Sequence, residues 1–257
     1  VGSEMCIRDI YMRYNELTFQ GRNAVLEAFR SGKTIDKLFI LDGCQDGPIK
    51  SIVREAKKTD AIINYVDKER LDRLAGTGHH QGVVAIGAAY EYAEVEDILA
   101  AAKEKGEDPF IFILDEIEDP HNLGAIIRTA NLAGAHGVII PKRRAVGLTA
   151  TVAKTSAGAI NYTPVAKVTN ISQTIEELKK QGLWFVCADM GGETMYNLNL
   201  KGPIGLVIGN EGNGVSRLVK DKCDFIASIP MKGDIDSLNA SVAAGVLAYE
   251  IVRQRLN

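Results

Sequence analysis

The sequence predicts an α/β protein with two domains, and three observations support this fold class. The chain has 257 residues, a length that suits one large domain or two ordinary ones. Short apolar runs alternate with segments whose apolar residues recur at helical spacing, which is typical of strands and helices packed in layers. The apolar run at residues 204–208 ends at a glycine-rich turn, as a buried parallel strand does where it leaves a sheet.

The composition excludes several classes of protein. Hydrophobic residues make up 46% of the chain and charged residues 25%, which is typical of a soluble globular protein. No apolar run approaches the length of a membrane span and no signal peptide is visible, so we expect a cytoplasmic protein with no membrane partner. The net charge of −3 argues against a simple nucleic-acid coat but allows an RNA enzyme with a local basic patch. We expect incidental thiols and no metal site, because metal-type spacing is missing from the four cysteines: Cys6, Cys44, Cys187 and Cys223.

The first part of the chain predicts a leader, a small domain and a linker. Residues 1–14 begin without Met and show no period, so we interpret them as a leader outside the fold, with the natural start near Met12. Residues 15–90 predict a small α/β/α domain, with helices near 23–30, 46–56 and 67–74 and strands at 37–41, 62–66 and 83–87. Residues 91–108 are acidic and then rich in Ala, Lys and Glu, and we interpret them as a linker plus a polar helix that ends at Gly106.

Residues 109–257 predict a second α/β domain with a mostly parallel sheet. Strands are expected at 110–114, 137–140, 183–188, 204–208 and 225–229. Helices are expected from Asn122 onward and at 149–157, 171–180 and 215–221. A last helix is expected to start at Ser237, with Val242, Val246 and Tyr249 facing inward.

Three stretches of this domain could carry chemistry, although each also has a plain structural interpretation. The turn G-N-E-G-N-G-V-S at 209–216 could simply join a strand to a helix, or its glycines could let backbone approach a ligand. Asn122 could be a helix cap, and Arg128 either a surface arginine or a fork that holds a phosphate. Ser237 and Asn239 could cap the last helix or hold a polar ligand.

Taken together, the three stretches resemble the signature motifs of the SpoU (TrmH-type) branch of the SPOUT methyltransferases, in the family's order. The first motif is matched by Asn122 and Arg128, the second by 209–216, and the third by I-P-M at 229–231 with S-L-N at 237–239. G-R-N-A-V-L-E-A from Gly21 and H-Q-G-V-V-A from His80 resemble the substrate-binding domain of RlmB-type enzymes, which methylate a guanosine ribose in 23S rRNA. The resemblance covers nearly the whole chain after the leader.

The resemblance implies a fold, a cofactor and a reaction that periodicity could not reveal. The N-terminal domain would be ribosomal-protein-like, and the C-terminal domain a SPOUT fold with a deep trefoil knot, a feature otherwise nearly absent from proteins. The methyl donor would be S-adenosylmethionine, with its adenine against main-chain groups of Gly209, Ile229 and Leu238. The product would be a 2′-O-methylguanosine in 23S rRNA, and the enzyme a homodimer through its C-terminal domain.

The same resemblance assigns catalytic roles. Arg128 would activate the ribose hydroxyl, and since an arginine cannot act as an ordinary base, we expect it to grip the neighbouring phosphate and stabilise the developing alkoxide. Asn122, Glu211, Ser237 and Asn239 would position the ribose, Arg128 and the donor. Glu211 could instead be a buried partner of Arg128 or of backbone N–H groups.

Further candidate contacts with RNA are Arg22 and His80 in the first domain and the basic loop with Arg143 and Arg144, although such loops are usually just solvated. Three alternatives stay open. The enzyme could methylate tRNA, or be a resistance-type rRNA methyltransferase. It could be a silent RNA-binding homologue. The glycine turn could also serve a nucleotide or NAD enzyme of another class.

Overall fold

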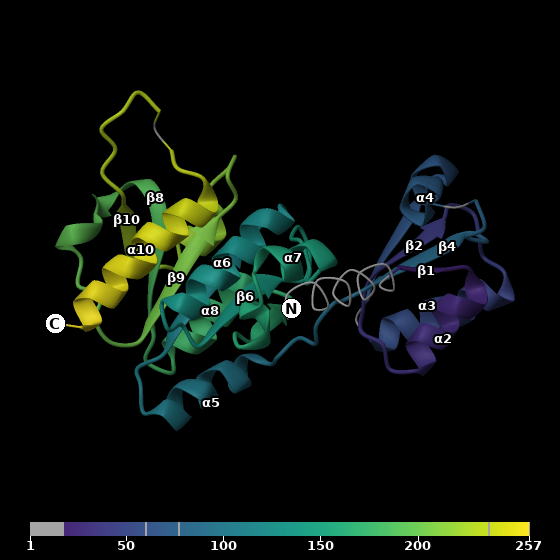
Figure 1. Ribbon diagram of the computed structural model, residues 1–257, viewed down its shortest axis with the longest axis horizontal. Coiled ribbons are helices and arrows are strands. Elements are labelled where there is room, and N and C mark those ends of the chain that lie inside the picture. Colours follow the sequence, from purple (N-terminus) through teal and green to yellow (C-terminus); the bar gives the residue numbers. More distant parts are fainter. Residues whose placement is uncertain (1–17, 60, 77, 236, 257) are drawn as a thin grey trace, which may run out of the picture. The chain divides into compact units, whose positions relative to one another are not determined.

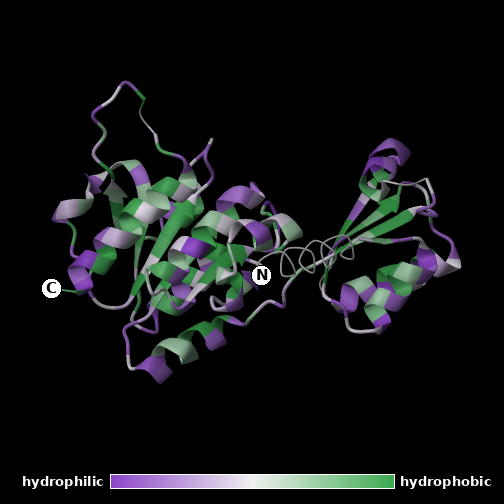
Figure 2. Cartoon of the chain, viewed as in Figure 1, coloured by the Kyte–Doolittle hydropathy of each residue, from purple (hydrophilic) through white to green (hydrophobic). Residues whose placement is uncertain are grey.

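The chain folds as two units, each with its own sheet and apolar core (Figure 1). The computed structural model describes residues 18–59, 61–76, 78–235 and 237–256. The first unit ends at Glu91 and includes the segment Gly147–Ala150, and the second takes the rest of the chain from Tyr92. The predicted leader at 1–14 and Cys6 lie outside the described residues. In both units hydrophobic residues concentrate in the strands (Figure 2).

The first unit has a mixed four-stranded sheet in the order β1-β4-β2-β3. Strands β2 and β3 are parallel, whereas β4 runs antiparallel to both β1 and β2. Alternate residues of β2 face opposite sides, so Leu38 packs under α2 and α3 while Phe39 packs under α4. Helices therefore pack on both faces of this sheet, and the short strand β1 was not among the predicted strands. The elements are β1 (Thr18–Gln20), α2 (Arg22–Arg30), β2 (Ile35–Leu41), α3 (Gly47–Lys58), β3 (Ile62–Val66), α4 (Lys68–Ala75) and β4 (Val83–Gly87).

The residues predicted as a linker, 91–108, belong instead to the second unit. Helix α5 (Val95–Lys105) inserts Ile98 into the same core as the central strands. The contact is so close that a β-carbon on Gly137 would lie 2.6 Å from the Ile98 side chain. The acidic surroundings hid an apolar stripe that Val95, Ile98 and Ala102 form at helical spacing. The predicted helix is therefore present and ends at its C-cap Gly106, whereas the interpretation of these residues as a linker was wrong.

The second unit has a six-stranded sheet in the order β10-β8-β9-β5-β6-β7, in which every neighbouring pair is parallel. Strands β5 and β9 lie side by side in its centre, and all their residues are buried. Their carboxyl ends coincide, because Asp115 is the register partner of Gly209. The elements are β5 (Phe110–Asp115), α6 (Pro120–Leu132), β6 (Gly137–Pro141), α7 (Ala150–Thr155), β7 (Val165–Val168), α8 (Ile171–Lys179), β8 (Trp184–Thr194), β9 (Ile204–Gly209), α9 (Arg217–Lys220), β10 (Phe225–Ser228) and α10 (Ala240–Arg255), with 3-10 turns at Ala159–Asn161 and Met195–Asn197.

Two predicted helix starts differ from the structure. Helix α6 is capped by Asp119, whose carboxylate accepts the His121 N–H at 2.9 Å, and Asn122 lies buried within its first turn. Helix α10 begins at Ala240 with Asn239 as its cap, so Ser237 precedes the helix. Both shifts arise because an alternative polar residue nearby satisfies the first free N–H groups.

The inward face of α10 also differs from the prediction. Val242 is 49% exposed and Tyr249 51% exposed, while Leu247 and Ile251 are buried against the sheet. The stretch 242–249 of the helix, V-A-A-G-V-L-A-Y, is apolar all round, so its sequence alone could not distinguish the two faces.

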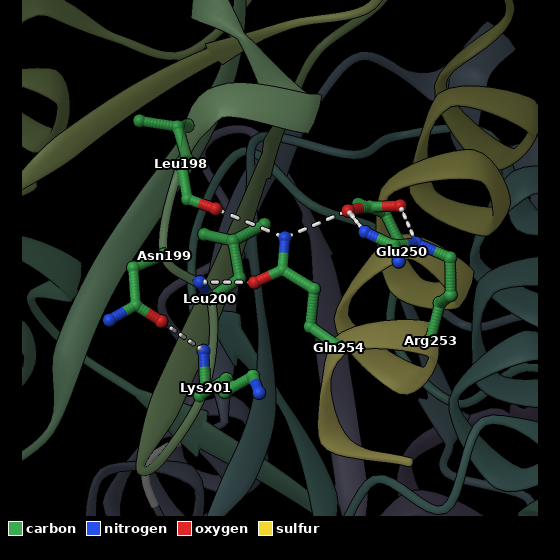
Figure 3. A network of polar contacts seen from close by, with 7 residues as sticks. All are labelled: Leu198, Asn199, Leu200, Lys201, Glu250, Arg253 and Gln254. Atoms are coloured by element: carbon green, nitrogen blue, oxygen red, sulfur yellow. Dashed lines mark hydrogen bonds and ion pairs between the residues drawn. The ribbon is translucent and has the colours of Figure 1, made fainter. Parts of the chain in front are cut away.

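The far end of α10 is tied to the segment that enters β9 (Figure 3). Gln254 accepts the Leu200 N–H at 2.8 Å and donates to the Leu198 carbonyl at 3.0 Å. Its amide also donates to the buried carboxylate of Glu250 at 2.8 Å, which Arg253 holds through two further bonds. Both termini of α10 are thus fixed by side-chain hydrogen bonds.

Candidate cofactor and substrate site

Four segments enclose a pocket of about 410 Å³ at the carboxyl edge of the parallel sheet. This edge is where ligands bind in open α/β sheets. The pocket is lined by all three residues that were predicted to contact the cofactor: Gly209, Ile229 and Leu238. The lining residues are Ala188, Asp189, Met190, Ile208, Gly209, Asn210, Glu211, Gly212, Asn213, Gly214, Ala227, Ile229, Met231, Ser237, Leu238, Ala240 and Ala243.

The glycine turn after β9 folds back on itself. Asn210 and Gly214 exchange backbone hydrogen bonds of 3.1 and 2.8 Å, and Gly214 has a φ of +65°. A β-carbon on Gly209 would lie 2.1 Å from the carbonyl carbon of Gly214, a distance at which the backbone would have to move. Both positions therefore require glycine, as the sequence predicted for a turn that approaches a ligand.

Strand β5 holds this turn in place. The buried carboxylate of Asp115 accepts the Ser216 N–H at 2.7 Å. The Asn210 side chain donates to the Glu116 carbonyl at 2.9 Å. Since both anchors come from the end of the neighbouring strand, the turn is fixed relative to the sheet.

One residue from each of the three motifs joins a hydrogen-bond network that reaches the pocket through Glu211. The Asn239 amide donates to Asn122 Oδ1 at 3.0 Å and to Glu211 Oε1 at 2.9 Å, and the Asn122 amide donates to the same Glu211 oxygen. The Asn239 side chain is also fixed by the start of α10, because its oxygen accepts hydrogen bonds from the N–H groups of Ser241 and Val242. Asn122 and Glu211, which lie 89 residues apart in the sequence, thus share one hydrogen-bond network.

Arg128 lies apart from this network. Its side chain is exposed on α6, and within the described part of the chain it forms no hydrogen bond or ion pair. The interpretation of Glu211 as a buried partner of Arg128 was therefore wrong, since Glu211 is exposed and binds Asn122 and Asn239. Ser237 is exposed at the pocket rim.

The candidate RNA contacts of the first unit have structural partners. Arg22 pairs with Asp46 at 2.5 Å and donates to the Gln81 carbonyl at 3.1 Å, which ties the start of α2 to two loops.

His80 is only 5% exposed, and both ring nitrogens are used. Nδ1 accepts the Gly82 N–H at 3.0 Å, and Nε2 bonds to Asp72 at 2.8 Å. The structure therefore argues against His80 as an RNA contact.

The two arginines of the basic loop are placed differently. Arg144 has a φ of +55° and pairs with Glu116 at 3.1 Å, next to the anchor of the glycine turn. Arg143 is exposed and has no polar partner among the residues that the structure describes.

The fourth wall of the pocket, formed by Ala188, Asp189 and Met190, was not predicted. Lys220 of α9 forms an ion pair with Asp189. The Lys220 ammonium holds the pKa of the Asp189 carboxyl below its usual value, and Asp189 in turn raises the pKa of Lys220. The only sequence signal was an Asp placed directly after an apolar strand.

Comparison with known proteins now identifies the family. Residues 109–249 match the SpoU rRNA Methylase family, and residues 20–93 match the domain described as RNA 2'-O ribose methyltransferase substrate binding. The chain is 53% identical over 236 residues to YacO of Bacillus subtilis, which is named as a TrmH-family tRNA/rRNA methyltransferase; the match covers 91% of this chain and 94% of that protein.

The chain belongs to the SpoU/TrmH family of RNA methyltransferases. A Staphylococcus haemolyticus protein named for the same family is 49% identical, over 93% of this chain and 96% of that one. Among solved structures, the SpoU methyltransferase AviRb from Streptomyces viridochromogenes, in complex with AdoMet, superposes with a TM-score of 0.59 at 25% identity, over 93% of this chain and 90% of that one. An A. aeolicus TrmH/SpoU tRNA modifying enzyme gives 0.53 at 29% identity, over 58% and 77% of the two chains.

The prediction of S-adenosylmethionine as cofactor is confirmed, and the pocket suits it. The volume of about 410 Å³ lies within the range of small-molecule sites. The apolar part of the pocket wall is formed by four alanines: Ala188, Ala227, Ala240 and Ala243. The backbone of the glycine turn lines the pocket beside them. Within the described residues no three His, Cys, Asp or Glu side chains are grouped to hold a metal, and no helix is long and apolar enough to cross a membrane.

Proposed function

We propose that the protein methylates the 2′-hydroxyl of a guanosine ribose in 23S rRNA, as RlmB-type enzymes do. The observation that carries this proposal is the network of Asn122, Glu211 and Asn239, whose member Glu211 lines the cofactor pocket. The family match of residues 20–93 to a substrate-binding domain of RNA 2'-O ribose methyltransferases supports the choice of the ribose.

The chain's residues would prepare the hydroxyl for attack. When bound, S-adenosylmethionine supplies a methyl group on a positively charged sulfur. The network is rigid because each of its members is held by at least two bonds, so it can fix the ribose in line with the donor. Arg128 would grip the adjacent phosphate and stabilise the oxygen as its proton leaves.

We further propose that the enzyme is a homodimer through the α6 and α10 surface. Helix α10 packs on α6 where Gly245 faces Thr129, and it exposes Val242 and Tyr249 beside that contact. Arg128 precedes Thr129 on α6 and is exposed. A dimer formed there would let the free Arg128 serve the pocket of the second copy.

The deep trefoil knot implied by the family resemblance also stays a proposal. The convergence of the turn after β9 with the segment before α10 at one pocket supports it. Single-molecule stretching between residues 110 and 256 would test it, because a knotted chain pulled taut stays shorter than a linear chain of equal length. An unfolded length equal to that of a linear chain would contradict the knot.

The substrate is tested by mapping ribose methylation. The purified protein and S-adenosylmethionine are added to 23S rRNA and to tRNA from cells that lack the gene, and modified nucleosides are located by mass spectrometry. We expect one new 2′-O-methylguanosine in 23S rRNA and none with Arg128→Ala. Methylation of tRNA alone would contradict the choice of rRNA, and no methylation of either would favour a silent RNA-binding homologue.

A further inference from the structure

Strand β8 leaves the sheet beside the cofactor pocket. Cys187 pairs with Ile226 of β10, but the next residue of β10, Ala227, pairs with Glu193. Residues 188–192 of β8 therefore have no pairing partner in β10 and form a bulge between two consecutive paired positions of that strand. The start of this bulge forms the unpredicted wall of the pocket. Such large bulges redirect side chains, and here the side chain concerned is a carboxylate.

The carboxylate of Asp189 is fixed in one orientation. Its Oδ1 accepts the Gly191 N–H at 3.1 Å within the bulge, and its Oδ2 accepts from the Lys220 ammonium. A β-carbon on Gly214 would lie 4.0 Å from Oδ2, so the carboxylate lies beside the glycine turn, and both line the pocket. The Lys220 ion pair keeps the acid ionised, because it lowers the pKa of Asp189.

Two carboxylates line the pocket among its described residues, and they differ in their partners. Glu211 is engaged by the amides of Asn122 and Asn239. Asp189 has the two partners just named, whereas an ionised carboxylate offers about four acceptor sites. Asp189 is 25% exposed and so remains accessible from the pocket.

We propose that Asp189 binds the ribose diol of S-adenosylmethionine and that Lys220 is a positioning residue that orients Asp189. The proposal rests on the cofactor assignment alone and is independent of the RNA substrate. Vicinal hydroxyls are donors, and a carboxylate binds ribose hydroxyls in the same way in dinucleotide sites. The donor's ammonium group is a less suitable partner, because it would lie next to the Lys220 cation.

Calorimetry with ligand fragments tests the contact without measuring activity. The ligands are 5′-methylthioadenosine, which has the diol but no amino-acid group, its 2′,3′-dideoxy analogue, and S-adenosylhomocysteine. We expect removal of the diol to weaken binding to the wild type about tenfold or more. The Asp189→Ala variant should bind 5′-methylthioadenosine as weakly as the wild type binds the dideoxy analogue. Its affinity should not fall further when the diol is removed from the ligand.

Matched variants separate a direct contact from a structural effect. Glu176→Gln removes the partner of Lys222 outside the pocket and should leave all three affinities unchanged. Lys220→Met should weaken 5′-methylthioadenosine but not the dideoxy analogue. Thermal unfolding checks that each variant is folded, and Asp189→Asn replaces Asp189→Ala should the latter fail to fold.

Two outcomes would overturn the proposal. Asp189→Ala and removal of the diol each reduce the binding affinity by some factor. If the two factors multiply when both changes are made, Asp189 shapes the pocket without contacting the ribose. If Asp189→Ala weakens only S-adenosylhomocysteine, the carboxylate binds the ammonium group instead.

Discussion

The two edges of the parallel sheet use polar side chains in different ways. At the carboxyl edge, Asn122, Glu211 and Asn239 bond to one another beside a pocket. At the amino edge, His136 and Arg255 bond mainly to the backbone: His136 accepts the Phe110 N–H at 3.0 Å, and Arg255 donates to the carbonyls before β5 and β9. Side chains that satisfy backbone groups serve the fold, whereas side chains that satisfy each other can hold a ligand. Substitutions at the two edges should therefore have different effects.

The largest effect on the methylation rate is expected from Arg128→Ala. Arg128 belongs to the polar network of neither edge. Loss of a group that stabilises developing charge should reduce the methylation rate by about 10²–10³-fold. Because Arg128 does not line the pocket, the affinity for S-adenosylhomocysteine should stay the same. Single-turnover kinetics and calorimetry measure the two quantities, and an equal loss in both would place Arg128 in the cofactor site.

Gly209→Ala should damage the carboxyl edge. The new methyl group would overlap the Gly214 backbone, which should cost about 1–3 kcal/mol of stability and reduce cofactor affinity. Gly233→Ala is the matched control, since a β-carbon there meets nothing within 4 Å. Thermal unfolding and calorimetry would show the difference, and equal behaviour of the two variants would contradict the tight turn.

Gln254→Ala should affect stability without a direct effect on the pocket. The Leu200 N–H and Leu198 carbonyl would lose their partner, which should cost about 1–3 kcal/mol in urea unfolding. Asn199→Ala, in the same segment but exposed, removes only a local bond to Lys201 and should cost much less. A neutral Gln254 variant would mean that packing alone fixes α10.

The smallest effect is a pH dependence at the amino edge. Burial lowers the pKa of His136 from 6.5, so the unfolded chain binds the proton more readily than the folded one. The stability that the neutral ring contributes is therefore complete above pH 6.5 and is lost as the pH falls through the folded-state pKa. His136→Gln keeps an acceptor and a donor but does not titrate. Urea unfolding of both proteins at several pH values should show the wild type losing more stability on acidification, and parallel curves would contradict this.

Local signals explain what could be predicted from the sequence. The strand at 204–208 and the requirement for Gly209 followed from an apolar run and a glycine turn, and the structure agrees with both. The meeting of Asn122, Glu211 and Asn239 required the family resemblance, because no local pattern joins segments so distant in sequence.

Long-range features explain what could not be predicted. Asp189 reaches the pocket through a break in register between β8 and β10, which depends on both strands together. Val242 and Tyr249 were assigned to the wrong face because the stretch 242–249 of α10 is apolar all round. The interpretation of 91–108 as a linker failed because acidic neighbours hid the apolar residues with which α5 joins the core.

Helix α10 is held by side-chain hydrogen bonds at both ends, one near the pocket and one at its last turn. Asn239 caps it beside the pocket, and Gln254 fastens it to the segment before β9 about 22 Å away. Removal of the last turn of α10 would therefore loosen the same helix whose cap belongs to the network beside the pocket.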